Sequence, residues 1–298
     1  MLALGAGRFS ANFHRMRTQP KSRPVALTIA GSDSGGGAGL QADLKTFAAL
    51  GVHGTSVITC LTAQNPRRIL GVESCSPKML RLQLEAVFSE LPPAAVKTGM
   101  LFSAGNIAAV ADFLRKTKNL KLVVDPVMVS TSGARLLQPA AEKALREKLL
   151  PLAALITPNV DEAEILVEQK IRSPEDLRSA ARKIVARFGG AALVKGGHLK
   201  NSREAIDIFF DGQTELLLSA PFVKGVPTHG TGCTYSAAIC AALALGHGLP
   251  HAVEIGKNFI TTAISQSYRI AHHFALEQNY GGHHPPALSA SEKCPCCS

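Results

Sequence analysis

The sequence has little of what a membrane protein or a nucleic-acid-binding protein requires. No apolar run among its 298 residues approaches the roughly 20 residues that a membrane-spanning helix needs. The formal net charge is +10, but the lysines and arginines are scattered, without a dense basic run or interleaved aromatic residues. We therefore expect neither a membrane nor a nucleic acid as partner. The charge fits small phosphorylated metabolites equally well.

The seven cysteines lack the even spacing of a disulfide framework. Four lie in apolar or motif-like sequence, and three crowd the C-terminus: Cys60, Cys75, Cys233 and Cys240, then Cys294, Cys296 and Cys297. This usage is typical of a reduced, intracellular protein and predicts a cytoplasmic location. The C-x-C-C tail has no second ligand pair at zinc-site spacing, which favours a frayed tail over a metal site.

No proline-rich or glycine-rich linker and no internal repeat divides the chain between Pro24 and Leu276. With 46% hydrophobic and 18% charged residues, the composition suits one large core. We predict a single domain over residues 25–277, a disordered basic leader over residues 1–24 and a disordered tail over residues 278–298. The leader contains no acidic residue, as in transit peptides, but a disordered segment is the favoured interpretation.

Short apolar or β-branched runs alternate with longer helical patterns from Pro24 onward. Strands are predicted within residues 25–32, 54–65, 94–99, 120–127, 153–159 and 191–197, and helices over 39–51, 78–91, 104–117, 139–151 and 174–189. This alternation predicts βαβ units, hence an α/β fold with a mostly parallel sheet covered on both faces. Residues 205–221 read as an edge hairpin turning at Asp211-Gly212, and two long helices are expected over 231–245 and 251–276.

Ligands of such a sheet bind at the carboxyl ends of its strands. The first of these loops, "GSDSGGGAGLQAD", has glycines that let the backbone approach a ligand. Its "GAGLQA" matches a dinucleotide-binding pattern, but no acidic residue lies between Asp43 and Glu73 to hold a ribose. The P-loop pattern is also absent, so a mononucleotide would have to be held differently.

The stretch "THGTGCTYSAAICAALALG", residues 228–246, offers that different way. Gly230, Thr231 and Gly232 can turn backbone N–H groups inward where a helix begins, and the positive end of the helix dipole points the same way. The pattern predicts an anion hole, which is what phosphoryl transfer needs. Cys233 follows, and we expect the same field to lower its thiol pKa so that it can act as a base. The alternative is a small buried packing residue, as expected for Cys240.

Three further strand ends carry polar side chains. Asp125 and Asn159 each follow a predicted strand, Glu162 stands in the first turn of the next helix, and Lys195 ends another strand. Oxygen ligands on separate loops suit Mg²⁺ bound with nucleotide phosphates. Glu162 would equally suit the helix dipole alone, and a lone lysine such as Lys195 is ordinarily a solvated surface charge.

Seven motifs, in order, closely resemble those of the hydroxymethylpyrimidine and hydroxymethylpyrimidine-phosphate kinases of thiamin biosynthesis, which have the ribokinase-like fold. They are "TIAGSDSGGGAGLQADLKTFAALG", "TAQNP", "VKTGML", "VVDPVM", "ITPNVDEAEIL", "LVKGGH" and "THGTGCTYSAAI". The resemblance covers about residues 25–275. It implies a three-layer ribokinase-like domain and transfer of the γ-phosphoryl group of ATP to the pyrimidine and then to its monophosphate. It also suggests a homodimer.

The resemblance further implies residue roles. Gln64 of "AQN" would bind the aminopyrimidine, because one amide can serve a ring nitrogen and an exocyclic amine together. The other pocket positions would be Gly31, Asp43, Met100 and Val127. Cys233 would be the base beside Gly230 and Gly232, and Asp125 and Glu162 would organise Mg²⁺ directly or through water. Asn159, Lys195, Thr228 and Thr231 would hold ATP and the transferring phosphate. Asp33, Asp161 and His198 receive no role.

Two rival functions stay open. A pyridoxal-type kinase would phosphorylate a hydroxymethyl group on a similar ring. A non-catalytic pyrimidine-binding protein would keep the pocket alone, although Asp125, Glu162, Lys195 and Cys233 together argue against it. The end of the chain departs from the family's Gly-His-Gly-x-Gly-Pro pattern, which puts a contribution of the tail to the site in doubt.

Overall fold

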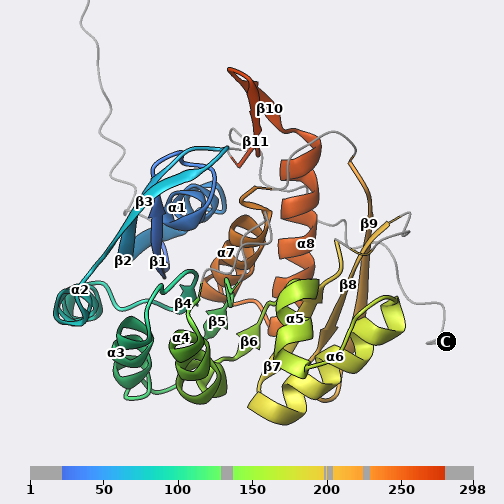
Figure 1. Ribbon diagram of the computed structural model, residues 1–298, viewed down its shortest axis with the longest axis horizontal. Helices are drawn as coiled ribbons and strands as arrows, with labels where there is room; N and C mark the ends of the chain where they lie inside the picture. The colour runs from blue at the N-terminus through green and yellow to red at the C-terminus, as the bar shows by residue number, and fades with distance from the viewer. Residues whose placement is uncertain (1–21, 129–136, 198, 200–203, 224–228, 279–298) are drawn as a thin grey trace, which may run out of the picture.

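The protein is built around one large sheet, seen in a computed structural model that describes residues 22–128, 137–197, 199, 204–223 and 229–278 (Figure 1). The sheet has nine strands within these residues, in the order β3-β2-β1-β4-β5-β6-β7-β8-β9. They are β1 (Val25–Asp33), β2 (His53–Gln64), β3 (Ile69–Ser74), β4 (Ala95–Thr98), β5 (Leu122–Val124), β6 (Leu155–Ile156), β7 (Ala191–Lys195), β8 (Glu204–Phe210) and β9 (Glu215–Pro221). Pairing is parallel from β2 to β7, and β3, β8 and β9 are antiparallel to their neighbours.

Helices cover both faces of this sheet, as predicted (Figure 1). They are α1 (Gly39–Ala49), α2 (Pro77–Glu90), α3 (Ala104–Leu114), α4 (Pro139–Ala144), α5 (Val160–Val167), α6 (Pro174–Phe188), α7 (Thr231–Ala244) and α8 (Leu249–Ser265). A π-helical turn (Leu145–Leu149) and a 3₁₀ turn (Leu150–Leu152) follow α4. Helices α2 to α6 pack on one face and α1, α7 and α8 on the other, which confirms the three-layer α/β architecture.

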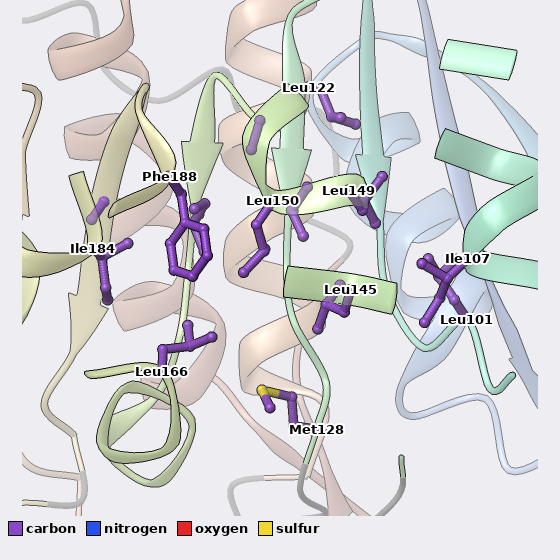
Figure 2. Close-up of a cluster of buried hydrophobic side chains, with 14 of the residues drawn as sticks. Leu101, Ile107, Leu122, Met128, Leu145, Leu149, Leu150, Leu166, Ile184 and Phe188 are labelled. Carbon is purple, nitrogen blue, oxygen red and sulfur yellow. The ribbon is translucent and has the colours of Figure 1, made fainter. Parts of the chain in front are cut away.

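The two hydrophobic cores follow from the alternation of strand side chains. Leu122 and Val124 of β5 belong to the core under α2 to α6, whereas Val123 belongs to the core under α1, α7 and α8. Figure 2 shows part of the larger core, where Leu150 after α4 and Phe188 of α6 are both drawn. The buried strands are therefore apolar on both sides, as the near-continuous hydrophobic runs predict.

The predicted alternation of strands and helices is confirmed, and the differences lie in the last helix and in one missed strand. The edge hairpin of β8 and β9 is confirmed, with Gly212 at positive φ in its turn. The expected helix over residues 251–276 ends at Ser265, and the aromatic and β-branched residues beyond it form a small hairpin, β10 (Tyr268–Ile270) and β11 (His273–Ala275). Strand β3 was not predicted, because all six of its residues are exposed and give no alternating pattern.

The strand order reverses at β1, with β2 and β3 on one side and β4 to β9 on the other. The parallel strands all end at the same edge of the sheet, and the loops there form the crevice in which α/β proteins bind ligands. Within the described residues, no helix is both long enough and apolar enough to span a bilayer.

Candidate functional site

Three strand ends bring polar side chains together, as the sequence predicts. Asp125 follows β5, Asn159 follows β6, and Lys195 is the last residue of β7. The backbone of Asn159 forms a parallel bridge with that of Lys195, and the Lys195 N–H donates to the Pro158 carbonyl at 2.9 Å. These segments therefore lie side by side at the carboxyl edge of the sheet.

Asp125 is the centre of a buried polar cluster. Its Oδ1 accepts from Lys195 Nζ at 3.0 Å and from Thr157 Oγ1 at 3.3 Å, and its Oδ2 accepts from Ser236 Oγ at 3.2 Å. Burial would raise the pKa of Asp125, but the charges of Lys195 and Lys97 and these hydrogen bonds hold that pKa below its ordinary value. Asp125 is therefore ionised at neutral pH and paired with Lys195.

Glu162 caps the N-terminus of α5 and also lies close to Asp125. It forms a capping box with Asn159, whose Oδ1 accepts the Glu162 N–H at 2.9 Å while Glu162 Oε2 accepts the Asn159 N–H at 3.0 Å. Glu162 Oε1 accepts the Met128 N–H at 3.0 Å. Burial and the negative charge of Asp125 raise the pKa of Glu162 to about 7. Asp161 is exposed and joins none of these contacts.

Helix α7 begins against this cluster. Gly230 is its N-cap, with φ +82°, and a Cβ there would lie 1.8 Å from the Gly37 carbonyl oxygen, so only glycine fits. A Cβ on Gly232 would lie 3.3 Å from Lys195 Nζ and 3.7 Å from Asp125 Oδ2. The first turn of α7, which includes Thr231, thus faces the Asp125–Lys195 pair. Thr228 and His198 lie outside the described residues.

Cys233 lies in this first turn, but the expectation of a lowered pKa is wrong. Burial raises the pKa of the thiol to about 11. The charge of Lys97 and a hydrogen bond from the Gly39 backbone oppose this effect, while Asp43 and Asp125 reinforce it. Desolvation outweighs the charge of Lys97 and the Gly39 hydrogen bond, so Cys233 is a thiol at neutral pH in the free protein. Cys240 is fully buried in the core under α1, α7 and α8, as expected.

Four of the positions predicted for the pyrimidine lie at or just beyond the carboxyl ends of β1, β2, β4 and β5: Gly31, Gln64, Met100 and Val127. A Cβ on Gly31 would lie 2.8 Å from both Cys60 Sγ and the Met100 methyl group, so Gly31 and Met100 are direct neighbours. Gln64 ends β2, and its Oε1 accepts from Thr62 Oγ1 at 3.4 Å. Val127 is half-buried two residues beyond Asp125 and has φ +44°, a rare conformation for a β-branched residue.

Asp43, also predicted to line the pocket, has its carboxylate engaged by other residues of the protein. It is fully buried, and Lys97 Nζ donates to its two oxygens at 2.7 and 2.8 Å while Thr28 Oγ1 donates at 2.6 Å. Asp43 lies on the face of α1 that turns towards the sheet, where a charge needs an internal partner. Its oxygens are engaged by protein donors, and its exposed surface is zero.

Four residues of the site region were missed or left without a role by the sequence: Asp33, Lys97, His229 and Ser236. Lys97 gave one signal, a lone charge in an otherwise apolar strand. Ser236 follows Gly232 by four residues, which places both on the same side of α7. Asp33 and His229 contact each other across 196 positions, a pairing that no local pattern announces.

The donor set fits a magnesium ion that is held largely by phosphates. Among the described side chains, no three His, Cys, Asp or Glu residues gather closely enough to hold a metal by themselves. Asp125 and Glu162 are close enough for the charge of one to raise the pKa of the other, a repulsion that a cation would relieve. Mg²⁺ in such sites is bound by one or two carboxylates together with nucleotide phosphates and water. Asp125 and Glu162 can supply the carboxylates.

Comparison with known proteins agrees with this geometry. Residues 33–277 match the family model described as phosphomethylpyrimidine kinase. The hydroxymethylpyrimidine/phosphomethylpyrimidine kinase of Rhizobium meliloti (strain 1021) is 50% identical over 259 residues, covering 84% of this chain and 97% of that protein. The crystal structure of phosphomethylpyrimidine kinase from Clostridium difficile 630 superposes with a TM-score of 0.74 and 43% identity, over 81% of this chain and 100% of that one.

The same fold occurs in a kinase of another vitamin. The ADP complex of Bacillus subtilis pyridoxal kinase superposes with a TM-score of 0.78 and 36% identity, over 86% of this chain and 98% of that one. The fold is thus the ribokinase-like one that the sequence resemblance implies. Family model, curated relative and solved kinase structures agree over the greater part of the chain, and the chain belongs to the phosphomethylpyrimidine kinase family.

Proposed function

We propose that the protein transfers the γ-phosphoryl group of Mg-ATP to the 5-hydroxymethyl group of 4-amino-5-hydroxymethyl-2-methylpyrimidine, and then to the monophosphate so formed. The observation that carries this proposal is the contact between the Asp125–Lys195 pair and the first turn of α7 at Gly232. This contact brings the Lys195 ammonium group, the Asp125 carboxylate and the N-terminus of α7 together at one edge of the sheet, in a chain that belongs to this kinase family. That combination suits a transferring phosphoryl group.

Phosphoryl transfer depends mainly on positioning and on neutralising charge. The backbone from Gly230 to Cys233 would accept the transferring group at the positive end of α7, and Lys195 would balance its charge from the side. Asp125 and Glu162 would hold Mg²⁺, which supplies neutralisation of the phosphates when bound. Asn159, whose side chain is engaged in its capping box, would contribute to the ATP site through the position of its loop. Thr228 and Thr231 would bind the transferring phosphate, as the sequence resemblance implies.

Cys233 is the proposed acceptor of the hydroxyl proton. Only its thiolate can accept a proton, and the free protein favours the thiol. Lys97 and the Gly39 backbone favour the thiolate, whereas Asp43 and Asp125 oppose it. Neutralising Asp125 during ligand binding would remove one of the charges that oppose the thiolate. We propose that Cys233 accepts the proton in the loaded enzyme.

On the other side of the site, Gln64 would hydrogen-bond the aminopyrimidine, with Gly31, Met100 and Val127 around the ring. We further propose one kinase domain over residues 25–277, a homodimer and a cytoplasmic location, as the sequence predicts.

The test is direct. The purified protein is incubated with Mg-ATP and, separately, with hydroxymethylpyrimidine, its monophosphate and pyridoxal, while ADP and the phosphorylated product are measured. Turnover of both pyrimidines well above that of pyridoxal supports the proposal. Turnover of pyridoxal alone would instead identify a pyridoxal-type kinase, and binding without turnover a pyrimidine-binding protein.

A further inference from the structure

The β1–α1 loop, which we define as residues 33–38 from the last residue of β1 onward, is organised around the carboxylate of Asp33. Asp33 Oδ1 accepts the Gly35 N–H at 2.8 Å, and Oδ2 accepts the N–H groups of Gly37 and Ala38 at 3.2 and 2.9 Å. The Asp33 carbonyl accepts the Gly36 N–H at 2.9 Å. The backbone donors of this loop thus converge on an anion that belongs to the protein itself.

This arrangement changes the role expected for the glycine-rich loop. Burial would raise the pKa of Asp33, but the hydrogen bonds from His229, Gly35 and Ala38 outweigh it and hold that pKa below its ordinary value. Asp33 is therefore ionised and occupies the place that a phosphate would take in a glycine cradle. Because Asp33 takes the backbone donors of this loop, we assign phosphate binding to the first turn of α7.

Asp33 also reaches the residue just before that turn. His229 Nε2 lies 3.2 Å from Asp33 Oδ2, and a Cβ on Gly37 would lie 3.0 Å from His229 Cδ2. In the next residue, Gly230, a Cβ would lie 1.8 Å from the Gly37 carbonyl oxygen. The β1–α1 loop and the start of α7 are therefore in backbone contact, with the Asp33–His229 pair beside that contact.

Cys233 lies where the two helix N-termini meet. It belongs to the first turn of α7, and it receives a hydrogen bond from the backbone of Gly39, the first residue of α1. A shift of the β1–α1 loop relative to α7 would displace this donor from the thiol and the anion hole from the crevice.

We propose that Asp33 and His229 are positioning residues that hold the first turn of α7 against the β1–α1 loop, so that the Gly230–Cys233 backbone is aimed at the transferring phosphoryl group. The inference rests on the proposed function, because it assigns that backbone to the phosphoryl group. Neither side chain needs to touch a substrate for this role.

The first test compares Asp33→Asn, His229→Gln and the double variant in the kinase assay. A misplacement on the order of 1 Å can cost about 10²-fold in rate. We expect kcat to fall at least about tenfold in each single variant, with the KM for the pyrimidine within about threefold. Residues that act as one unit are non-additive, so the double variant should be no slower than the slower single variant. Rates within about twofold of the wild type, or losses that multiply, would overturn the proposal.

Two variants in the same loop region serve as matched controls. Lys45 Nζ donates to the Gly36 carbonyl at 2.7 Å without reaching α7, so Lys45→Ala should keep kcat within about twofold. Ser34 is tied to the other side of the site, where its Oγ donates to the Gln64 carbonyl at 2.7 Å and accepts the Gln64 N–H at 2.8 Å. Ser34→Ala should raise the pyrimidine KM and spare kcat. An equal loss of kcat in Lys45→Ala would assign the effect to general loop order and overturn the proposal.

The second readout does not depend on turnover. Alkylation of each cysteine by iodoacetamide can be followed peptide by peptide in the full chain. Cys233 is partly exposed and Cys240 is buried. Loss of the Asp33–His229 pair should expose Cys233 further and speed its alkylation at least about threefold, with Cys240 unchanged as the buried reference. Unchanged alkylation of Cys233 in both single variants would contradict the proposal. If the wild type turns over no substrate, the proposed function fails, and this readout still decides whether the pair holds the two segments together.

Discussion

Two lysine–aspartate pairs lie on the same sheet and differ in what surrounds them. Lys97 of β4 and Asp43 of α1 are 2.7 Å apart, and both side chains are 0% exposed. Lys195 of β7 and Asp125 after β5 are 3.0 Å apart, with 13% and 4% of their side chains exposed. The first pair is sealed between the sheet and α1, and the second opens onto the crevice.

The difference lies in where each lysine stands along its strand. Lys97 is the third residue of β4 and meets α1 beneath the sheet edge, so its partner must be internal. Burial alone would lower its pKa, but the charge of Asp43 raises it. Lys195 ends β7 beside Gly232, where a ligand can share its charge. We infer that the sealed pair maintains the fold and that the open pair serves the reaction.

Cys233 lies in the field of both pairs, and its removal should have the largest effect on turnover. General-base catalysis contributes about 10²–10⁴-fold, so Cys233→Ala should lower kcat within that range while the circular dichroism spectrum is retained. Cys240→Ala is a matched control in the same helix. Near-normal turnover of Cys233→Ala would return Cys233 to a packing role.

The sealed pair should respond to mutation as a structural element. Lys97→Ala leaves Asp43 buried without its cation, which should lower the free energy of unfolding by about 3–5 kcal/mol. Denaturant unfolding measures this loss. The double variant Lys97→Met, Asp43→Leu removes both charges and should recover most of it. If Lys97→Ala unfolds with the wild-type midpoint, the pair does not have the structural role assigned to it.

The open pair should respond in the opposite way. Lys195→Ala should lower kcat by about 10²–10³-fold, because a preorganised charge beside the transferring group is lost. Its free energy of unfolding should fall less than that of Lys97→Ala, since the remaining Asp125 is still hydrogen-bonded by Thr157 and Ser236. A variant that loses stability but not turnover would reverse the comparison between the two pairs.

A smaller effect is expected at the far end of the site. Gln64→Ala should raise the pyrimidine KM about tenfold, the equivalent of roughly one hydrogen bond, and leave kcat within about threefold. Gln83→Ala is a control, because that amide is hydrogen-bonded to the backbone of Ile58 in β2. An unchanged KM in Gln64→Ala would remove this residue from the proposed pocket.

The pH dependence of Cys233 alkylation tests the charge environment of this thiol, which lies near both lysine–aspartate pairs, without any mutation. Its folded-state pKa of about 11 lies above the ordinary value of 9.0, so the fold stabilises the thiol. That stabilisation is complete below the ordinary value and is lost as the pH rises through about 11. Alkylation of Cys233 should therefore keep rising with pH from 7 to 10 (roughly tenfold per pH unit) with no plateau. A plateau near neutral pH would show a thiolate in the free protein.

The sequence predicted those parts of the molecule that depend on local pattern. Alternating strands and helices follow from hydrophobic periodicity, and Asp125 and Lys195 were found because each ends an apolar run. Strand β3 was missed, because exposed residues carry no such pattern. The hairpin after α8 was missed, because residues 266–276 continue a plausible helical sequence.

The remaining differences concern burial and long-range contacts. The sequence assigns Asp43 to the pocket, but it does not show that this carboxylate is buried against Lys97 of β4. The pKa of Cys233 was expected to fall, because the helix dipole is visible in the sequence and desolvation is not. Asp33 and His229 stand 196 residues apart, so their contact exists only in the folded chain.

The most direct test of the central claim is the rate of hydroxymethylpyrimidine phosphorylation by the wild type and by Lys195→Ala, measured with Mg-ATP and confirmed by the mass of the product. We predict that the wild type forms the monophosphate and then the pyrophosphate, and that the folded variant is at least about a hundredfold slower. Equal rates in the two proteins, or no product from the wild type, would contradict the account.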